Sequence, residues 1–203
     1  MARGRPRTFE TEAALDRAVQ AFWRHGFEAC SLSLLLDEMG LSRSSFYQAF
    51  GDKTRLFCTA LERYCTAYSR ELAARLDASG SAFSFLRESL TAIAEGQAGQ
   101  PAGCMLMNSA AELGTAGDPV RSAIDYGLER FRSVFRRAVQ RAQDEGDIPP
   151  DADSAQLSDF LIACICGLRT LSKAGVDAGR LRAIAAVGLR SLETGSAGRA
   201  TRH

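Results

Sequence analysis

The chain has little of the chemistry on which most enzymes and metal proteins depend. It contains only two histidines, His25 and His203, in 203 residues, too few for a His-based zinc site or a Ser–His mechanism. Its six cysteines include no C-x-x-C pair. Cys164 and Cys166 would point about 200° apart on a helix, so they cannot hold one metal together. The sequence therefore indicates no enzyme, no metal site and no cofactor.

Long apolar runs and a strong charge of one sign are also missing. The longest apolar run, residues 160–168, is far too short to span a bilayer. The start, "MARGRPRTFE", lacks the apolar region of a secretory signal. These observations predict a cytoplasmic protein with reduced cysteines and no membrane partner. The net charge of +1 gives no overall basic field for nucleic acid, so the distribution of charge matters more.

Helical periodicity runs through nearly the whole chain, and no stretch alternates as a strand does. Glycine and proline divide the pattern into about nine segments, which predicts an all-α protein of about nine helices. The first helix should end before Gly26, and the fourth should be long and begin at Asp52 as N-cap. The other expected bounds are about 31–39, 42–50, 82–95, 104–113, 118–146, 154–173 and 177–192, with Asp118 as an N-cap followed by Pro119.

Two short helices joined by a glycine turn are expected at residues 31–39 and 42–50. This helix-turn-helix form places its second helix in the major groove of DNA. Gly40 suits the sharp turn, and Leu41 supplies an apolar plug between the helices. Ser42 is the expected N-cap, and its hydroxyl can also meet a phosphate. The outer face has side chains suited to base edges, namely Arg43, Ser44, Ser45 and Gln48.

Lys53 lies in the first turn of the following helix. A cation there opposes the helix dipole, at a cost of about 0.3–1 kcal/mol, unless an external anion binds. A helix N-terminus with a lysine is suited to binding a phosphate. The alternative is an ammonium group in water. Tyr47 has a similar alternative, a half-buried ring with a solvated hydroxyl.

The segment "GFEACSLSLLLDEMGLSRSSFYQAFGDKTRLF" resembles the helix-turn-helix signature of the tetracycline-repressor family. The resemblance covers about residues 9–56, and the G-F, G-L-S, S-F-Y and G-D-K groups match in order and spacing. It implies a DNA-binding domain at residues 1–51 and an all-α ligand-binding and dimerisation domain at 52–193. It also implies a homodimer in which ligand binding shifts the fourth helix and spoils half-site spacing. The last ten residues, 194–203, are expected to be a disordered tail.

The resemblance assigns roles to individual residues. Phosphate contacts would fall on Ser31, Ser42, Tyr47 and Lys53, and base-reading positions on Arg43, Ser44, Ser45 and Gln48. The basic residues Arg3, Arg5 and Arg7 would by themselves form a solvated tail, but the resemblance makes them minor-groove or phosphate binders. Three residues depart from the family pattern: Leu36 replaces a small residue, Ala49 a histidine or other polar residue, and Cys30 a threonine. Leu36 would require a slightly wider helix crossing or a compensating rotation, and Ala49 would remove one phosphate contact.

The last two expected helices are apolar on more than one face. Their apolar residues are Leu157, Phe160, Leu161, Cys164, Leu168, Leu171, Leu181, Ile184, Val187 and Leu192. Pairing with a two-fold copy would bury them in a four-helix bundle and predicts a homodimer. Such a dimer can place two reading helices about 34 Å apart on a palindromic operator. The alternative is that these residues form the core of a monomer.

Cys104 opens the segment "GCMLMNSAAELG" after a glycine-rich loop. N–H groups at a helix N-terminus stabilise a thiolate, so Cys104 is a candidate for reaction with an electrophile or oxidant. With the D-P-x-V helix and "GLRTLSKAG", this segment resembles a subgroup of the family whose repressors respond to reactive electrophiles. The alternative is a buried structural cysteine.

A ligand pocket within the helical bundle is also expected. Its candidate lining is Cys104, Tyr64, Tyr68, Met105, Asn108, Phe131 and Phe135. Met and Phe at helical spacing fit a plain core equally well. Asn108 and Glu112, four residues apart, either orient a ligand or face water.

The combined reading is a cytoplasmic, homodimeric transcriptional repressor that binds a palindromic double-stranded DNA operator. A small-molecule effector or cysteine modification would release it. One alternative is an activator or a regulator with a non-electrophile ligand. Another is a small-molecule-binding adaptor that has lost DNA binding, against which the "SRSSFY" run, Lys53 and the basic arm argue.

Overall fold

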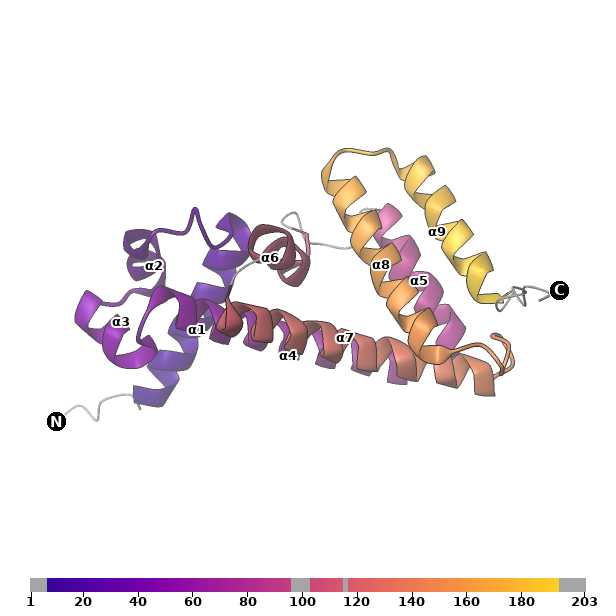
Figure 1. Cartoon of the computed structure of the whole chain (residues 1–203), viewed down its shortest axis with the longest axis horizontal. Coiled ribbons are helices and arrows are strands. Elements are labelled where there is room, and N and C mark those ends of the chain that lie inside the picture. The colour runs from indigo at the N-terminus through magenta and orange to yellow at the C-terminus, as the bar shows by residue number, and fades with distance from the viewer. Residues whose placement is uncertain (1–6, 96–102, 115–116, 194–203) are drawn as a thin grey trace. The chain divides into compact units, whose positions relative to one another are not determined.

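The structure is a computed structural model that describes residues 7–95, 103–114 and 117–193. Within these ranges it contains nine α-helices and no strand, as the periodicity predicts (Figure 1). The helices are α1 (Arg7–His25), α2 (Leu32–Met39), α3 (Arg43–Phe50), α4 (Lys53–Ala78), α5 (Ala82–Ala94), α6 (Met105–Leu113), α7 (Asp118–Asp144), α8 (Ser154–Lys173) and α9 (Ala178–Glu193). In the described part of the chain, no helix has the length and apolar character needed to cross a membrane.

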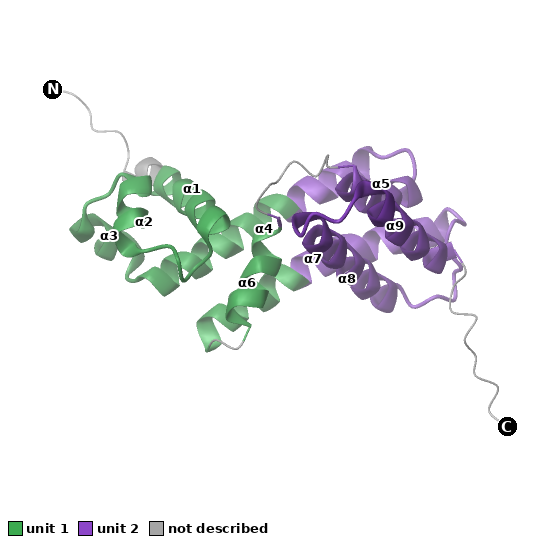
Figure 2. Ribbon diagram, turned by 90° about the horizontal axis from the view of Figure 1, so that it is seen from above, with its two compact units in different colours: residues 1–68, 104–128 green, residues 69–103, 129–203 purple. Residues whose placement is uncertain are grey.

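The helices pack into two compact units (Figure 2). Unit 1 comprises Met1–Tyr68 and Cys104–Leu128, and unit 2 comprises Ser69–Gly103 and Glu129–His203. Packing therefore groups α6 and the beginning of α7 with the first three helices, while α4 and α7 contribute to both units. The predicted functional division at residue 51 stays a prediction.

Local capping signals account for the helix boundaries around the glycine turn. Ser31 Oγ accepts the Leu34 N–H at 3.1 Å and Ser42 Oγ accepts the Ser45 N–H at 3.2 Å, which confirms both predicted N-caps. Asp52 caps α4 by accepting the Arg55 N–H at 2.9 Å. Gly40 closes α2 with φ 66°, a left-handed conformation that glycine adopts without a Cβ clash.

The segment α7 starts at Asp118 as expected, but the predicted role of Asp118 as N-cap is wrong. The helix begins at Asp118, so Pro119 is its second residue and Asp118 is not an N-cap outside it. This arrangement is permitted because the first four N–H groups of a helix have no intrahelical acceptor, and proline lacks only such a group.

The core of unit 1 is an aromatic cluster between α1 and α4. The Phe57 ring meets the Phe22 ring edge-on at 5.1 Å between centroids. Arg63 of α4 reinforces this packing at the surface by donating to both carboxylate oxygens of Asp16, at 2.6 and 3.0 Å, and by pairing with Glu12. These contacts fix α1 on α4, and α2, the first of the glycine-turn helices, packs against α1.

In unit 2, α5 packs against α8 and α9, and its Phe85 ring lies 6.0 Å from Phe135 of α7. Leu161 and Leu168 of α8 are buried, and so are four residues of α9: Leu181, Ala185, Gly188 and Leu192. The same two helices expose Phe160, Ile184 and Val187, the last at 55%. The two-sided apolar character predicted for α8 and α9 therefore divides into a buried face and an exposed face.

Glu145, beyond the end of α7, is bonded to the first turn of α5. Its carboxylate accepts the Ala82 N–H at 2.7 Å and pairs with Arg141 at 2.7 Å. The backbone hydrogen bond, followed by the Arg141 contact, holds the pKa of Glu145 below its ordinary value. Glu145 thus satisfies an N–H group that would otherwise have no acceptor at the start of α5.

We expect this contact to make the free energy of unfolding decrease at acidic pH. A carboxylate with a lowered folded-state pKa stabilises the fold above its unfolded pKa, and this contribution is lost as pH falls through the folded value. Glu145→Gln should therefore lower Tm at pH 7 and lose less additional Tm than the wild type between about pH 5 and pH 3. Thermal unfolding followed by circular dichroism measures this, with the exposed Glu88→Gln in α5 as control. An identical acid dependence in wild type and Glu145→Gln would contradict the assignment.

Candidate nucleic-acid interface

The helix α3 contributes almost nothing to the core. Of its eight residues only Phe46 is buried, and Phe50 is half-buried. The Phe46 ring lies 6.0 Å from the Phe50 ring and 5.4 Å from the Tyr47 ring. A helix of this length is not stable alone in water, so Phe46 and the caps hold it in place. Phe46 therefore packs inward, and the rest of the surface of α3 is left open.

The predicted base-reading residues are all on this open surface. Arg43, Ser44, Ser45 and Gln48 are exposed. Among the ion pairs of the described residues, none involves Arg43 or Lys53. An arginine with no intramolecular carboxylate keeps its forked donors available for an external acceptor.

The three serines at the start of α3 form a cluster that the sequence did not predict. Ser42 Oγ lies 3.0 Å from Ser44 Oγ and 2.9 Å from Ser45 Oγ, in addition to capping the helix. The hydroxyls of Ser44 and Ser45 are therefore turned toward the cap. Arg43, Tyr47 and Gln48 are the longer exposed side chains of α3, and which residues contact bases stays a prediction.

Lys53 is neither free in water nor paired with a carboxylate in the described residues. Its Nζ atom lies 4.3 Å from the centroid of the Phe27 ring. Such a cation–π contact is worth about 0.5–1 kcal/mol at an exposed site, which is comparable to the unfavourable helix-dipole term. Because the contact leaves the charge unneutralised, Lys53 remains suited to a phosphate. Tyr47 is 48% exposed, and Ser31 is exposed at the start of α2.

The predicted basic arm is only partly within the described residues. Arg3 and Arg5 lie outside them, and Arg7 is the first residue of α1 rather than part of an irregular arm. Pro6 precedes it directly, and proline is compatible with the position just before or at the start of a helix. Roles of these three arginines in DNA binding stay predictions.

The three residues that depart from the family pattern differ in how far they are buried. Cys30 is fully buried, and its N–H donates to the Phe27 carbonyl at 3.3 Å. Ala49 is exposed on α3 and offers no side-chain polar atom. Leu36 is half-buried, so this large side chain is not enclosed within the core of unit 1.

Cys104 is the N-cap residue of α6, but its thiol makes no capping hydrogen bond. It is 6% exposed, and the Tyr64 hydroxyl donates to its Sγ at 3.8 Å. The Tyr64 ring in turn contacts Trp23 at 5.3 Å and Tyr68 at 6.0 Å between centroids. The thiol therefore points at a tyrosine hydroxyl rather than at the N–H groups of the helix, which differs from the predicted setting.

Three of the other cysteines are unsuited to react. All six cysteines are free thiols. Burial is the main cause that raises the pKa of Cys30, Cys58 and Cys164. For Cys58 the neighbouring carboxylates of Glu62 and Asp52 add to this effect. Because the thiolate is the nucleophile, a raised pKa lowers the fraction of these three thiols that is able to react at neutral pH.

The candidate pocket residues fall in different units. Cys104, Tyr64, Tyr68, Met105 and Asn108 belong to unit 1, whereas Phe131 and Phe135 belong to unit 2. Met105, Phe131 and Phe135 are buried. That all seven line one pocket stays a prediction. An open pocket of about 500 Å³ within unit 2 contains none of them. It is lined by Ile93, Ala94, Glu95, Ser172, Val176, Ala178, Leu181 and Arg182.

Glu112 has a role that sequence reasoning missed. Its carboxylate accepts the N–H groups of Phe27 and Glu28, at 3.0 and 2.8 Å. Glu112 is thus attached to the turn between α1 and α2, whereas the two alternatives considered from sequence were a ligand contact and a solvated side chain. No local signal could have revealed this, since the bonded residues are 85 and 84 positions apart.

Two short helices joined by a glycine turn, the second with exposed polar and basic side chains, are typical of helix-turn-helix DNA-binding proteins. The comparisons with known proteins agree. The family described as "Bacterial regulatory proteins, tetR family" matches residues 14–58 of this chain. The domain family "Tetracyclin repressor-like, C-terminal domain" matches residues 84–187. The HTH-type transcriptional repressor ComR of Escherichia coli (strain K12) is 31% identical over 191 residues, covering 93% of this chain and 91% of ComR. The chain belongs to the tetR family and is a DNA-binding transcriptional regulator.

Solved structures support the fold. A cysteine mutant of the TetR family regulator CifR, complexed with a 26-bp double-strand operator DNA, has a TM-score of 0.75 at 31% identity, covering 93% of this chain and 100% of that chain. The reduced form of NemR from E. coli has a TM-score of 0.78 at 22% identity, covering 90% and 96%. The NemR likeness concerns the fold alone.

The burial of Phe46 generates a prediction about how α3 is held. Phe46→Ala should lower the free energy of unfolding by about 3–5 kcal/mol because it removes a fully buried ring and leaves a cavity. The neighbouring Tyr47→Phe should change it by no more than about 0.5 kcal/mol, since only an exposed hydroxyl is lost. Urea unfolding of the two variants measures both values. Equal stability of Phe46→Ala and wild type would show that α3 is held in another way.

Proposed function

We propose that the protein is a homodimeric repressor that binds a palindromic operator through α3 and leaves it when an effector or a cysteine-modifying compound acts. The observation that supports DNA contact most directly is the surface of α3. It exposes Arg43 without an intramolecular carboxylate, next to a helix start with the unneutralised Lys53. The repressor ComR and the operator-bound CifR support the same role.

The proposed assignment of contacts follows from side-chain length and position. Arg43 and Gln48 read base edges, because the hydroxyls of Ser44 and Ser45 are engaged at the cap. Ser31, Ser42, Tyr47 and Lys53 contact phosphates, and Arg3, Arg5 and Arg7 add contacts from the start of the chain. Phosphate contacts fix the register of the protein on DNA, while base contacts provide specificity.

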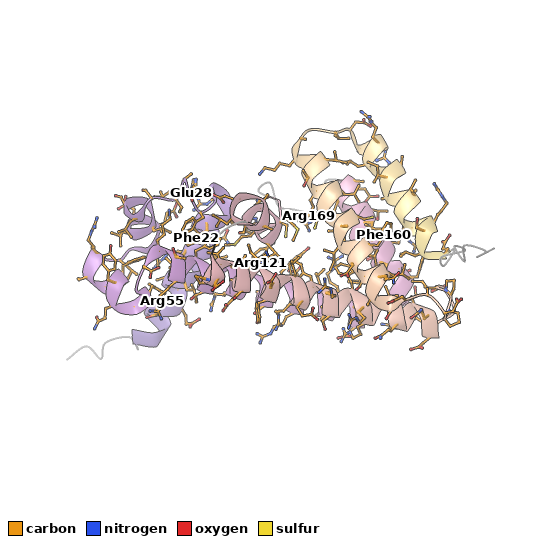
Figure 3. All side chains as sticks on the ribbon, viewed as in Figure 1. Phe22, Glu28, Arg55, Arg121, Phe160 and Arg169 are labelled. Atoms are coloured by element: carbon orange, nitrogen blue, oxygen red, sulfur yellow. The ribbon has the colours of Figure 1, made fainter. Side chains whose placement is uncertain are left out.

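The proposed dimer uses the exposed faces of α8 and α9. Phe160, labelled in Figure 3, Ile184 and Val187 are exposed large apolar residues of these helices. Large exposed apolar side chains are typical of interaction sites where they form one patch, and the proposed dimer places these three in one interface. A two-fold copy of the same surface buries them in an isologous interface and supplies the second reading helix that a palindrome requires.

The proposed effector step concerns Cys104. One solved relative supports thiol chemistry: the operator-bound CifR carries cysteine substitutions. With an α,β-unsaturated carbonyl compound, the Cys104 sulfur forms a bond to the β-carbon, and the α-carbon takes up the proton that the thiol loses. A side chain that is 6% exposed has no room for the added atoms, so the adduct must displace its neighbours.

A regulator with a non-electrophile ligand, bound near Tyr64, Tyr68, Met105 and Asn108, is the alternative. An adaptor without DNA binding is disfavoured by the open surface of α3. The proposed repressor acts on chromosomal DNA and hence in the cytoplasm, and no catalytic activity is proposed for it.

Substitutions at Lys53 and Arg43 should affect DNA binding in different ways. Lys53→Ala removes a phosphate contact in each half-site, so it should weaken all sequences alike and reduce the magnitude of the salt slope by about 1.8 per dimer. Arg43→Ala should cost about 1–3 kcal/mol per contacted base and relax the preference at that base only.

Fluorescence anisotropy over a salt series, with a duplex that the wild type selects from a random-sequence pool, measures both effects. Gln140→Ala, an exposed substitution on α7 in unit 2, serves as control. Failure of the wild type to select any sequence would overturn the repressor proposal. Uniform weakening by Arg43→Ala would overturn its role as a base reader.

Cys104→Ser should bind the selected duplex as tightly as the wild type but should no longer be released by N-ethylmaleimide, a small α,β-unsaturated imide. The serine hydroxyl keeps the volume of the site but is not a comparable nucleophile at neutral pH. Cys58→Ser is the matched control, because burial and neighbouring carboxylates raise the pKa of the Cys58 thiol. Release of Cys104→Ser at the wild-type rate would reject Cys104 as the sensor and favour the non-electrophile alternative.

A further inference from the structure

The carboxylate of Glu112 bonds two successive N–H groups of the turn that follows α1. Oε2 accepts the Phe27 N–H at 3.0 Å and Oε1 accepts the Glu28 N–H at 2.8 Å. Both oxygens are thus used, and both bonds are charge-assisted, which makes them shorter and stronger than bonds between neutral groups. Successive backbone N–H groups in a turn form an anion-binding concavity, and here the anion is supplied by α6 of the same unit.

The backbone at Gly26 allows the Glu112 carboxylate to approach the turn closely. Gly26 has φ +78°, and a Cβ atom at this position would lie 2.8 Å from Glu112 Oε2. Any other residue would therefore be strained in the backbone and would also press on the carboxylate. Glu28, labelled in Figure 3, belongs to this turn on the side of unit 1 where α6 packs. The close approach and the two bonds fix the position of residues 26–28 against the last turn of α6.

The side chain of Phe27 carries this constraint to the proposed DNA-binding surface. Its ring meets the Phe57 ring at 5.0 Å, and the ammonium group of Lys53 lies over it at 4.3 Å from the centroid. The backbone that Glu112 holds therefore belongs to the residue on which Lys53 rests. A displacement of the turn moves the ring, and Lys53 loses the contact that orients it.

The other end of α6 is attached to unit 1 as well. Cys104 precedes the helix and accepts the Tyr64 hydroxyl at 3.8 Å, and the Tyr64 ring contacts Trp23 of α1 at 5.3 Å. The helix between these ends is short, with nine residues from Met105 to Leu113. Because a helix moves as a rigid element over such a length, displacement at Cys104 is transmitted to Glu112.

We infer that Glu112 is a positioning residue for DNA binding, which clamps the turn at residues 26–28 and thereby holds Lys53 in place for a phosphate. Displacement of α6 opens the clamp and weakens the phosphate contact in each half-site. This inference rests on the proposed function, because it assigns to Glu112 the control of the same DNA-binding surface.

Glu112→Gln is the most informative substitution because it preserves the size and shape of the side chain. An amide has one acceptor oxygen, so its NH₂ group would face one of the two backbone donors. One N–H group would lose its acceptor, and the charge assistance of the other bond would be lost. Glu62→Gln is the matched control: it makes the same charge change at an exposed position of α4 in unit 1.

Hydrogen exchange without DNA tests the clamp itself. In Glu112→Gln, the amide protons of Phe27 and Glu28 should exchange at least about 10-fold faster than in the wild type, because the turn opens locally. Glu62→Gln should leave them unchanged. Unchanged exchange in Glu112→Gln would overturn the inference whatever the DNA affinity. If Glu112→Gln does not fold, Glu112→Asp, which keeps the charge and shortens the reach, takes its place with the same expectation.

A double-mutant cycle with Lys53→Ala tests the route to DNA. On the duplex selected by the wild type, Glu112→Gln should weaken binding about 5-fold or more and reduce the magnitude of the salt slope as Lys53→Ala does. In the Lys53→Ala background it should have little further effect. Additive losses, or full affinity of Glu112→Gln, would overturn the inference and leave the repressor proposal intact. A wild type that selects no sequence would overturn the proposed function instead.

Discussion

The structure depends on one constraint, which is that a helix of eight residues must be held rigidly while its outer face stays free. Phe46 is the only buried residue of α3, so the helix is held from one side through a single ring and its two caps. The rest of unit 1 serves this purpose. The Phe22–Phe57 contact and the Arg63 bridge to Asp16 join α1 firmly to α4, and α2 packs against α1.

Charge at the open surface follows from the same constraint. A cation that is to bind an external anion must not already be paired with a carboxylate of the protein. Among the ion pairs of the described residues, none involves Arg43 or Lys53. Lys53 is oriented by the quadrupole of the Phe27 ring, which attracts a cation without neutralising it. The serine hydroxyls at the start of α3 bond each other, so the polar groups of this surface are ordered before DNA arrives.

Much of this arrangement could be predicted from the sequence because it is encoded locally. Ser31, Ser42 and Asp52 cap their helices through residues only three positions away, and Gly40 marks the turn by its own conformation. The contacts that tie α6 to the turn after α1 were not predictable in this way. An exposed glutamate on a helix gives the same local pattern whether it faces water or binds a backbone 85 residues away. The burial of Cys104 beside Tyr64 likewise depends on tertiary packing.

The buried position of Cys104 constrains what kind of switch the proposed sensor forms. A thiol that is 6% exposed reacts only through transient opening of its surroundings, which favours small compounds over large ones. The start of α6 has no side-chain cap bond, whereas its end holds two charge-assisted bonds through Glu112. An adduct therefore displaces the weakly held end first. In the proposed switch, release of DNA requires that the strain of the adduct exceed the strength of the Glu112 clamp, about 1.5–3 kcal/mol per bond to a charged group and less at an exposed site. In the proposed switch, the strength of the clamp is therefore the strain that an adduct must exceed. With less strain, α6 moves only in part and the DNA-binding surface stays intact.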